Sequence, residues 1–170
     1  MSNHHPTPDE RRRHLRQILD HFDTAMLVSR DAEDAMLVAR PMKIAGIDDD
    51  GTMYFVANAQ THGTRDIEVD PRVAVTVQNK TAWATLTGTC HVSGDRDLID
   101  LLWQEEWRIF HPGGPDDPAL CVLVFEPDRA EYWDGAGTRG LSFLVRAAKA
   151  YVTGNPVVEP PEHAEIQLGR

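Results

Sequence analysis

The chain has 170 residues, of which 41% are hydrophobic and 26% charged, and its formal net charge at pH 7 is -10. This length and composition predict a globular protein with one main domain and a sizeable core. The negative charge argues against binding to duplex nucleic acid, because neutralising phosphates requires clustered Lys and Arg.

The first half of the chain alternates apolar runs with turn residues, as antiparallel strands do. Residues 1–8 are predicted to be a flexible N-terminus, and Thr7 or Asp9 is a candidate cap for a helix over 9–22. Pro41 cannot donate to a sheet ladder, so it should mark the end of a buried strand at a sheet edge or bulge. The predicted strands are 24–29, 36–42, 52–57 and 72–78, with a short helix over 65–69.

The second half continues with a strand over 83–92, in which Gly88 indicates a bulge or sharp bend. One helix is expected over 96–107, the last two strands over 120–125 and 129–133, a terminal helix over 142–151, and an extended Pro-rich tail over 155–170. Short strands joined by hairpins predict a mainly β protein, either a small barrel or a sandwich.

The cysteines, the histidines and the N-terminus indicate the redox state, the metal binding and the localisation to expect. Cys90 and Cys121 lie in different predicted strands, so both are expected to be reduced core thiols. The eight histidines are scattered, and apart from His4-His5 no pair has metal-ligand spacing in one element, so no metal site is predicted. The polar N-terminus lacks a signal-peptide core and no apolar run reaches the roughly 20 residues of a membrane span. We therefore expect a cytoplasmic protein without membrane or nucleic-acid partners.

Standard catalytic motifs are missing, but three features could carry a function. Arg40 leaves its strand as a permanent cation suited to phosphate or carboxylate, although it could also be an ordinary surface arginine. The polar segment 58–65 opens a helix, where backbone N–H groups bind anions. Trp133 offers a flat aromatic wall, or else a core or interface aromatic. Together they suit a phosphorylated planar heterocycle.

Several short motifs recur here in a known order. The chain resembles, from about Arg12 to Gly154, the general stress protein branch of the pyridoxamine 5′-phosphate oxidase-like proteins, which are FMN-binding split barrels. The motifs are Thr24-Ala25-Met26-Leu27, Arg40-Pro41-Met42, Tyr54-Phe55, Asp70-Pro71, Trp83 to Gly88, Leu102-Trp103 and Glu131-Tyr132-Trp133-Asp134.

The resemblance implies a six-stranded Greek-key split β-barrel with flanking α-helices, here residues 9–154. It also implies a homodimer that binds two FMN molecules in clefts at the subunit interface. By the resemblance, Arg40 reaches the flavin phosphate, and the backbone of Pro41 and Met42 lines the isoalloxazine ring. Trp133 packs near the flavin of the other subunit. The residues that continue the phosphate site are Ala57, Asn58, Thr61, His62 and Gly63.

The chain also departs from that branch. Thr61-His62-Gly63 stands where Ser-His-Lys is usual, so a phosphate-binding lysine is missing, and Ala57 replaces a common hydroxyl residue. Arg65 could supply the cation instead. True pyridoxamine phosphate oxidases follow the tryptophan with Arg-Leu-His-x-Arg, whereas residues 139–143 read Arg-Gly-Leu-Ser-Phe, which argues against that activity.

The resulting hypothesis is a flavin-binding redox protein of the stress-protein type, acting on an unidentified small molecule, with no catalytic residue assigned. FMN is the expected cofactor, and FAD and coenzyme F420 are alternatives. Two other functions stay open: a non-catalytic protein that binds or sequesters flavin, and a flavin-free dimeric scaffold.

Overall fold

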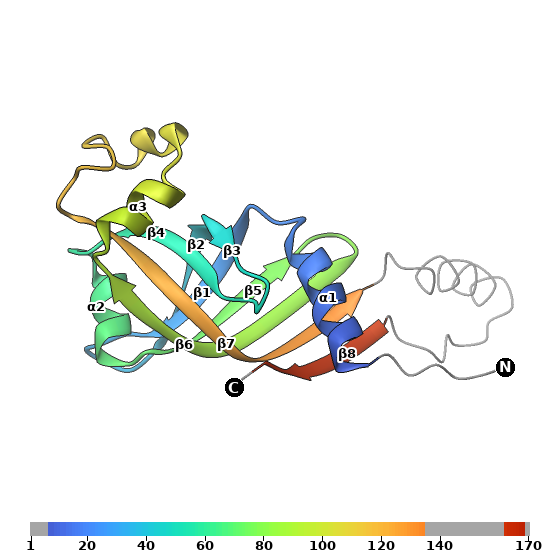
Figure 1. Cartoon of the computed structure of the whole chain (residues 1–170). Coiled ribbons are helices and arrows are strands. Elements are labelled where there is room, and N and C mark those ends of the chain that lie inside the picture. The colour runs from blue at the N-terminus through green and yellow to red at the C-terminus, as the bar shows by residue number, and fades with distance from the viewer. Residues whose placement is uncertain (1–6, 135–161, 169–170) are drawn as a thin grey trace, which may run out of the picture.

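One antiparallel sheet of eight strands forms the body of the protein and curls into a half-barrel (Figure 1). The computed structural model describes residues 7–134 and 162–168. The strand order is β2-β1-β5-β6-β7-β4-β3, and β8 pairs with β7 beside this path. The strands are β1 (Thr24–Arg30), β2 (Leu37–Lys43), β3 (Gly46–Ile47), β4 (Met53–Asn58), β5 (Arg72–Gln78), β6 (Ala82–Ser93), β7 (Leu120–Asp134) and β8 (Glu162–Gln167).

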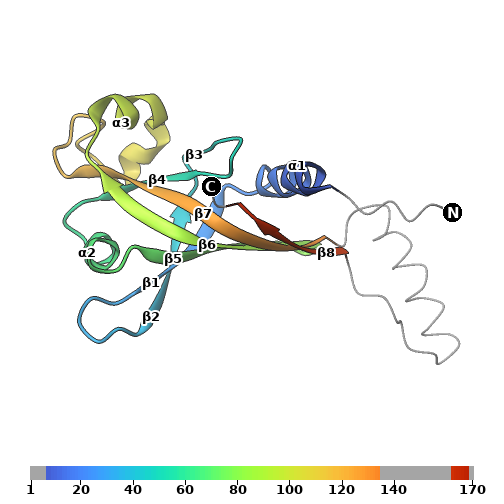
Figure 2. The ribbon, with the colours of Figure 1, turned by 60° about the horizontal axis from the view of Figure 1, so that its bottom comes forward.

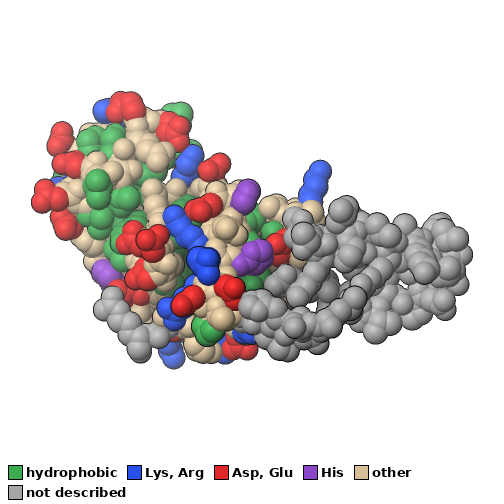
Figure 3. All heavy atoms as spheres, turned by 45° about the vertical axis from the view of Figure 1, so that its right-hand side comes forward, with side chains coloured by type: hydrophobic (Ala, Val, Ile, Leu, Met, Phe, Trp, Pro, Cys, Tyr) green, Lys and Arg blue, Asp and Glu red, His purple; other side chains and the backbone are tan. Residues whose placement is uncertain are grey.

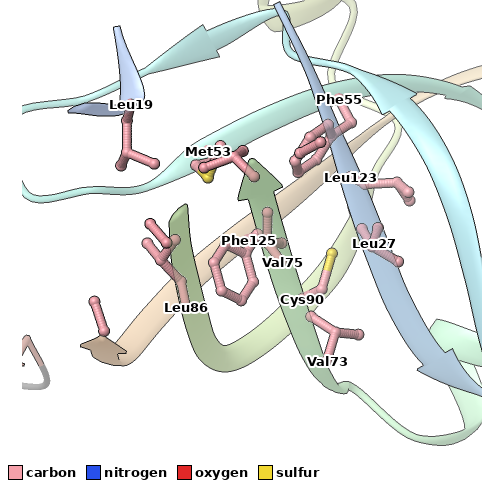
Figure 4. Packing of buried hydrophobic residues seen from close by; sticks show 14 of the residues in the cluster. Leu19, Leu27, Met53, Phe55, Val73, Val75, Leu86, Cys90, Leu123 and Phe125 are labelled. Atoms are coloured by element: carbon pink, nitrogen blue, oxygen red, sulfur yellow. The ribbon is translucent and has the colours of Figure 1, made fainter. Parts of the chain in front are cut away.

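The prediction of a mainly β split barrel is confirmed, although the sheet has eight strands instead of six. Inward-facing residues alternate along the strands and meet in one core, shown in Figure 4. Leu27, Val75 and Leu86 occupy directly paired positions on three neighbouring strands and are at most 2% exposed. The curled sheet therefore buries its inner face, and a second, smaller cluster of Ile99, Leu120, Val122 and Val124 covers part of its outer face.

Helix α1 (Pro8–Leu19) covers one end of the core. Thr7 caps it in a capping box with Glu10, so the first of the two candidate caps is the correct one. Its buried side chains are Leu15, Ile18 and Leu19. On its polar side, Arg16 donates to the carbonyl of Ile47 at 2.9 Å and Arg12 to that of Gln167 at 3.2 Å, which ties the helix to β3 and β8.

The bulge predicted at Gly88 is confirmed. The register of β6 and β7 shifts between Thr87 and Gly88, so that Asp128 has no partner in the ladder. A Cβ atom at Gly88 would lie 2.1 Å from the carbonyl oxygen of Glu126, which leaves room for glycine alone. The bulge also accommodates Pro127, because a proline without an N–H is tolerated where the ladder is interrupted. The two strands predicted over 120–125 and 129–133 are consequently one strand, β7.

The single helix predicted over 96–107 is wrong. Helix α3 (Arg96–Leu102) begins at the Asp95 cap and ends where Trp103 takes an extended conformation, with φ -59° and ψ 135°. A 3-10 helix, η1 (Glu105–Ile109), follows. Acidic side chains surround apolar ones on this lobe (Figure 3). Its exposed apolar residues are Leu101, Ile109 and Phe110.

The sequence also missed the last strand, since β8 was expected only as part of an extended tail. β8 pairs antiparallel with the second half of β7, and Ile166 reaches the core with 4% exposure. The predicted helix over 142–151, residues 139–143 and most of the N-terminal segment 1–8 lie outside the described residues. The domain boundaries at 9 and 154 stay predictions.

Both cysteines are free and buried on the neighbouring strands β6 and β7, as expected of reduced core thiols. Burial raises the pKa of the Cys90 thiol to about 12, with a smaller contribution from Cys121. Within the described ranges, no helix is long and apolar enough to cross a membrane. In the same part of the chain, no three His, Cys, Asp or Glu side chains gather as a metal site would require.

Candidate functional site

The arginine strand, β2, lies at one edge of the sheet and is exposed (Figure 2). The predicted edge position of Pro41 is confirmed, because β2 pairs with β1 alone and a missing N–H is tolerated there. Two details were wrong. The strand continues past Pro41 to Lys43, and it is not buried, since Leu37 is 67% exposed.

Arg40 points toward the inside of the half-barrel and is held by two side chains. It pairs across the ladder with the buried Leu27, and directly paired residues share a face. Its Nη1 donates to Ser29 Oγ at 2.7 Å and its Nη2 donates to Asp66 Oδ2 at 2.5 Å. Ser29 and Asp66 are 1% and 2% exposed. The guanidinium is thus held by Ser29 on β1 and by Asp66 on helix α2 (His62–Val69).

Arg40 keeps capacity for a further ligand. A guanidinium carries five N–H groups, and only two of those of Arg40 have a partner within residues 7–134 and 162–168. The side chain is 27% exposed, so a ligand can reach part of it. An anion such as a phosphate fits this donor set.

Gly63 lies directly against that guanidinium. A Cβ atom at residue 63 would lie 3.0 Å from Nε and 3.3 Å from Cζ of Arg40. Contacts this short would require Arg40 to move by a few tenths of an ångström. The glycine that replaces the expected lysine therefore leaves the space that Arg40 uses, and this explains the departure in structural terms.

The segment before Gly63 builds the start of α2 (His62–Val69), which begins three residues earlier than predicted. Thr61 caps the helix by accepting from the backbone N–H of Thr64 at 3.3 Å. The carbonyl of Asn58 accepts from the hydroxyls of both threonines, so Asn58 organises this turn. His62 stands exposed in the first turn, one residue from the Arg40 contact.

Three other residues assigned to the cofactor take different positions. Arg65 is exposed, and its side chain has no polar partner in the described part of the chain. Met42 packs against the core, and Ala57 is 9% exposed within it. The structure therefore brings together Arg40, Gly63 and the N-terminus of α2, and it places Met42 and Ala57 beneath them.

Trp133 lies at the other end of the sheet and on the opposite face. In Figure 1, α2 and the end of β7 are at opposite ends of the molecule. Trp133 pairs with Trp83, which is 38% exposed, while the adjacent Tyr132 and Ala84 are each 1% exposed and face the core. The indole therefore points outward, whereas Arg40 points inward.

An aromatic row surrounds Trp133 on this outer face. Trp83, Trp133 and His163 are paired in register across β6, β7 and β8. The rings of Trp133 and His163 are stacked, with centroids 4.9 Å apart and an interplanar angle of 16°. A groove of about 510 Å³ runs beside the row and is lined by Gln78, Trp83 and Trp133 together with hydroxyls of Thr76 and Thr85. Such a groove can accept a flat ring system.

Arg40 and Trp133 are four strand-to-strand steps apart in the order β2-β1-β5-β6-β7. At about 4.8 Å per step, the path along the sheet is roughly 19 Å. Because the two side chains also leave opposite faces, one flat ligand cannot lie against both in a single chain.

Sequence reasoning missed Ser29, Asp66, Trp83, Gln78 and His163. The strand alternation Ala25, Leu27, Ser29 could have placed the serine inward. The pairing of Asp66 with Arg40 and the stacking of His163 on Trp133 join segments 26 and 30 residues apart, and no local pattern signals either contact.

A family model and a known relative both match most of this chain. The family model described as pyridoxamine 5′-phosphate oxidase like matches residues 10–157. Protein bli-3 of Neurospora crassa is 26% identical over 144 residues, which cover 78% of this chain and 68% of that protein. The family match therefore includes both Arg40 and Trp133.

Solved structures show the same fold. A candidate general stress protein 26 from Jannaschia sp. CCS1 is 27% identical, with a TM-score of 0.69 over 89% of this chain and 94% of that one. A general stress FMN/FAD binding protein from Xanthomonas citri is 25% identical, with a TM-score of 0.62 over 72% of this chain and 87% of that one. The half-barrel is thus shared with general stress proteins.

Proposed function

The chain belongs to the pyridoxamine 5′-phosphate oxidase-like family, and we propose that it is a flavin-binding redox protein of the general stress protein type. The expected cofactor is FMN, with FAD and coenzyme F420 as alternatives. A bound flavin would supply hydride or electron transfer to a small molecule, and the protein would bind and orient the ring. The FMN/FAD binding protein of Xanthomonas citri, which has the same fold, supports this proposal.

The observation that carries the proposal is the separation of the two half-sites. Arg40 and the start of α2 offer donors for a phosphate on the inner side, and Trp133 with its groove offers a wall for a ring on the outer side. A ligand that needs both must lie between two copies of the chain. We therefore propose a homodimer with a cofactor cleft at each of two equivalent positions, as twofold symmetry requires.

Each residue has a distinct part in this arrangement. The free N–H groups of Arg40 would hold the phosphate, and the N–H groups at the start of α2, near His62, would add to the positive potential there. Trp133 of the second copy would cover the ring and exclude water. No described side chain is assigned as a general acid or base, so proton transfer is left to the substrate or solvent.

Complementation between two variants tests the shared site. Arg40→Ala and Trp133→Ala should each lose flavin binding when purified alone. Mixed subunits should recover binding, because a heterodimer holds one site in which both residues are intact. In an equal mixture about one quarter of all sites should be restored, since half of the dimers are mixed. The readout is bound flavin by absorbance after gel filtration.

Two outcomes would contradict the proposal. Absence of recovery with both variants folded would place Arg40 and Trp133 in separate sites. Failure of the wild-type protein to bind any flavin would leave the flavin-free scaffold as the function. The redox part has its own test, because a bound flavin that NADPH and dithionite never reduce would favour a non-catalytic flavin-binding protein.

A further inference from the structure

We propose that Asp66 tunes the anion subsite at Arg40, so that it favours phosphates carrying one charge each, as in FAD, over the dianionic phosphate of FMN. This inference rests on the proposed flavin function and concerns the choice among its cofactors. In this role Asp66 is a positioning residue, because it acts through Arg40 and need not touch the ligand.

Two carboxylates, those of Asp66 and Asp31, lie near the guanidinium of Arg40. Asp66 lies almost completely buried and accepts from Arg40 Nη2 at 2.5 Å and from the backbone N–H of Ala32 at 2.9 Å. Its carboxylate therefore neutralises the guanidinium at short range. Asp31 adds a second negative charge close by. A hydrogen bond from the N–H of Glu33 lowers the pKa of Asp31, and the charges of Arg40 and His62 add to this effect.

Residue 63 is a glycine where a lysine is usual in the related branch. A lysine at residue 63 would add a cation beside Arg40, but its Cβ would lie 3.0 Å from Nε of Arg40. Glycine lacks that cation and leaves the space next to Nε, Cδ and Cζ of Arg40 free of a side chain. Arg65 is the next cation along the helix, and its exposed side chain has no contact with Arg40. The two arginines of this region, Arg40 and Arg65, are thus matched by the two carboxylates of Asp31 and Asp66.

FMN and FAD differ in how much charge each phosphate carries. The phosphate of FMN is a monoester whose second ionisation has a pKa near 6, so at pH 8 it carries two negative charges. Its first charge can use the free N–H groups of Arg40, whereas its second is repelled by Asp66, and the nearest further cation along the helix is Arg65 in the next positions of α2. Each phosphate of FAD carries one charge and avoids this repulsion. Riboflavin carries none and serves as the reference.

The test is titration of the full-length wild-type protein, Asp66→Asn and Gly63→Lys with riboflavin, FMN and FAD at pH 8, followed by flavin fluorescence. Asparagine keeps the shape of Asp66 and removes its charge, but its single amide oxygen can replace only one of the two carboxylate oxygens that accept from Arg40 and Ala32. We expect wild type to bind FAD at least as tightly as FMN. Asp66→Asn should strengthen FMN binding about tenfold and riboflavin binding hardly at all, the effect of one short-range charge. The exposed Asp49→Asn is the matched control and should change none of the three.

The outcomes separate this inference from the proposed function. If none of the three flavins binds to wild type, the proposed function fails. If all bind, FMN is preferred over FAD, and Asp66→Asn leaves the ratio of the two affinities unchanged, then Asp66 is purely structural and this inference is overturned. Should Asp66→Asn fail to fold, Gly63→Lys decides, because it adds a cation at the same place. A Gly63→Lys variant with an unchanged FMN to FAD ratio would equally overturn it.

Discussion

The Arg40 end and the Trp133 end of the sheet are built in opposite ways. At the Arg40 end, charged and hydroxyl side chains from β1, β2 and α2 bind one another and are largely buried. At the Trp133 end, two indoles and an imidazole form an open row beside a groove. At the first end, Arg40 is bound by Ser29 and Asp66 of the same chain, whereas the second offers a surface that nothing in the same chain covers among the described residues.

This difference shows how one sheet can supply both halves of a shared site. A buried ion pair needs rigid support, because an unpaired buried charge is costly. The interlocked helix and hairpin supply that support at the Arg40 end. An aromatic wall needs only a flat strand face, which the outer side of β6, β7 and β8 provides. Substitutions should therefore disturb folding more at the first end than at the second.

The largest effect on stability is expected for Asp66→Ala. It leaves Arg40 partly buried without its counterion, and breaking a buried pair costs about 3–5 kcal/mol. The lower end, about 3 kcal/mol, applies here because the Arg40 side chain is 27% exposed. Urea unfolding measures the change. Asp49→Ala, at an exposed turn, should cost less than about 0.5 kcal/mol, and equal losses for the two variants would show that the pair contributes nothing.

A smaller change in stability, with a clear change in binding, is expected for Trp133→Ala. Loss of the stack on His163 should lower the free energy of unfolding by about 1 kcal/mol. Flavin affinity should fall about tenfold or more, because the proposed wall of the partner's cleft is lost. Phe110→Ala, an exposed aromatic on the η1 lobe, is the control for both measurements. A Trp133→Ala variant that unfolds as readily as Asp66→Ala would erase the contrast between the two ends.

The smallest expected effect is a loss of stability at low pH that arises from Asp70, at the C-terminus of α2. Asp70 caps the C-terminus of α2, and the hydrogen bonds from Arg72 lower its pKa from 3.8 to about 2. A carboxyl whose pKa is lower in the folded state stabilises the fold above its unfolded pKa, and this contribution disappears as the pH falls through the folded value. We expect the melting temperature to fall between pH 4 and pH 2, and to fall less in Asp70→Asn. The same decline in Asp70→Asn and wild type would assign the acid sensitivity to other groups.

Much of this architecture could be predicted from local patterns. Apolar alternation identified β1, β4, β5 and β6, and Gly88 signalled the bulge, because both depend on residues close in sequence. Arg40 was singled out by its charge next to a proline. The continuity of β7 through Pro127 was missed, since it depends on how the neighbouring strand β6 accommodates an interrupted ladder. The end of α3 at Leu102 was missed as well, because the apolar spacing continues to Trp107.

The amino-acid sequence alone determined the strand periodicity and the placement of Pro41 at a sheet edge or bulge, because these are properties of short stretches of chain. It also carried the family resemblance, in the order and spacing of motifs from about Arg12 to Gly154. Only the tertiary structure decided that Asp66 and Ser29 hold Arg40, that Gly63 makes room for it, and that His163 stacks on Trp133. Those contacts join segments that are distant in sequence, and they arise from the curl of the sheet and the docking of α2. The pairing of the strands places Arg40 and Trp133 on opposite faces of the sheet, because Arg40 is paired with the buried Leu27 and Trp133 with the exposed Trp83.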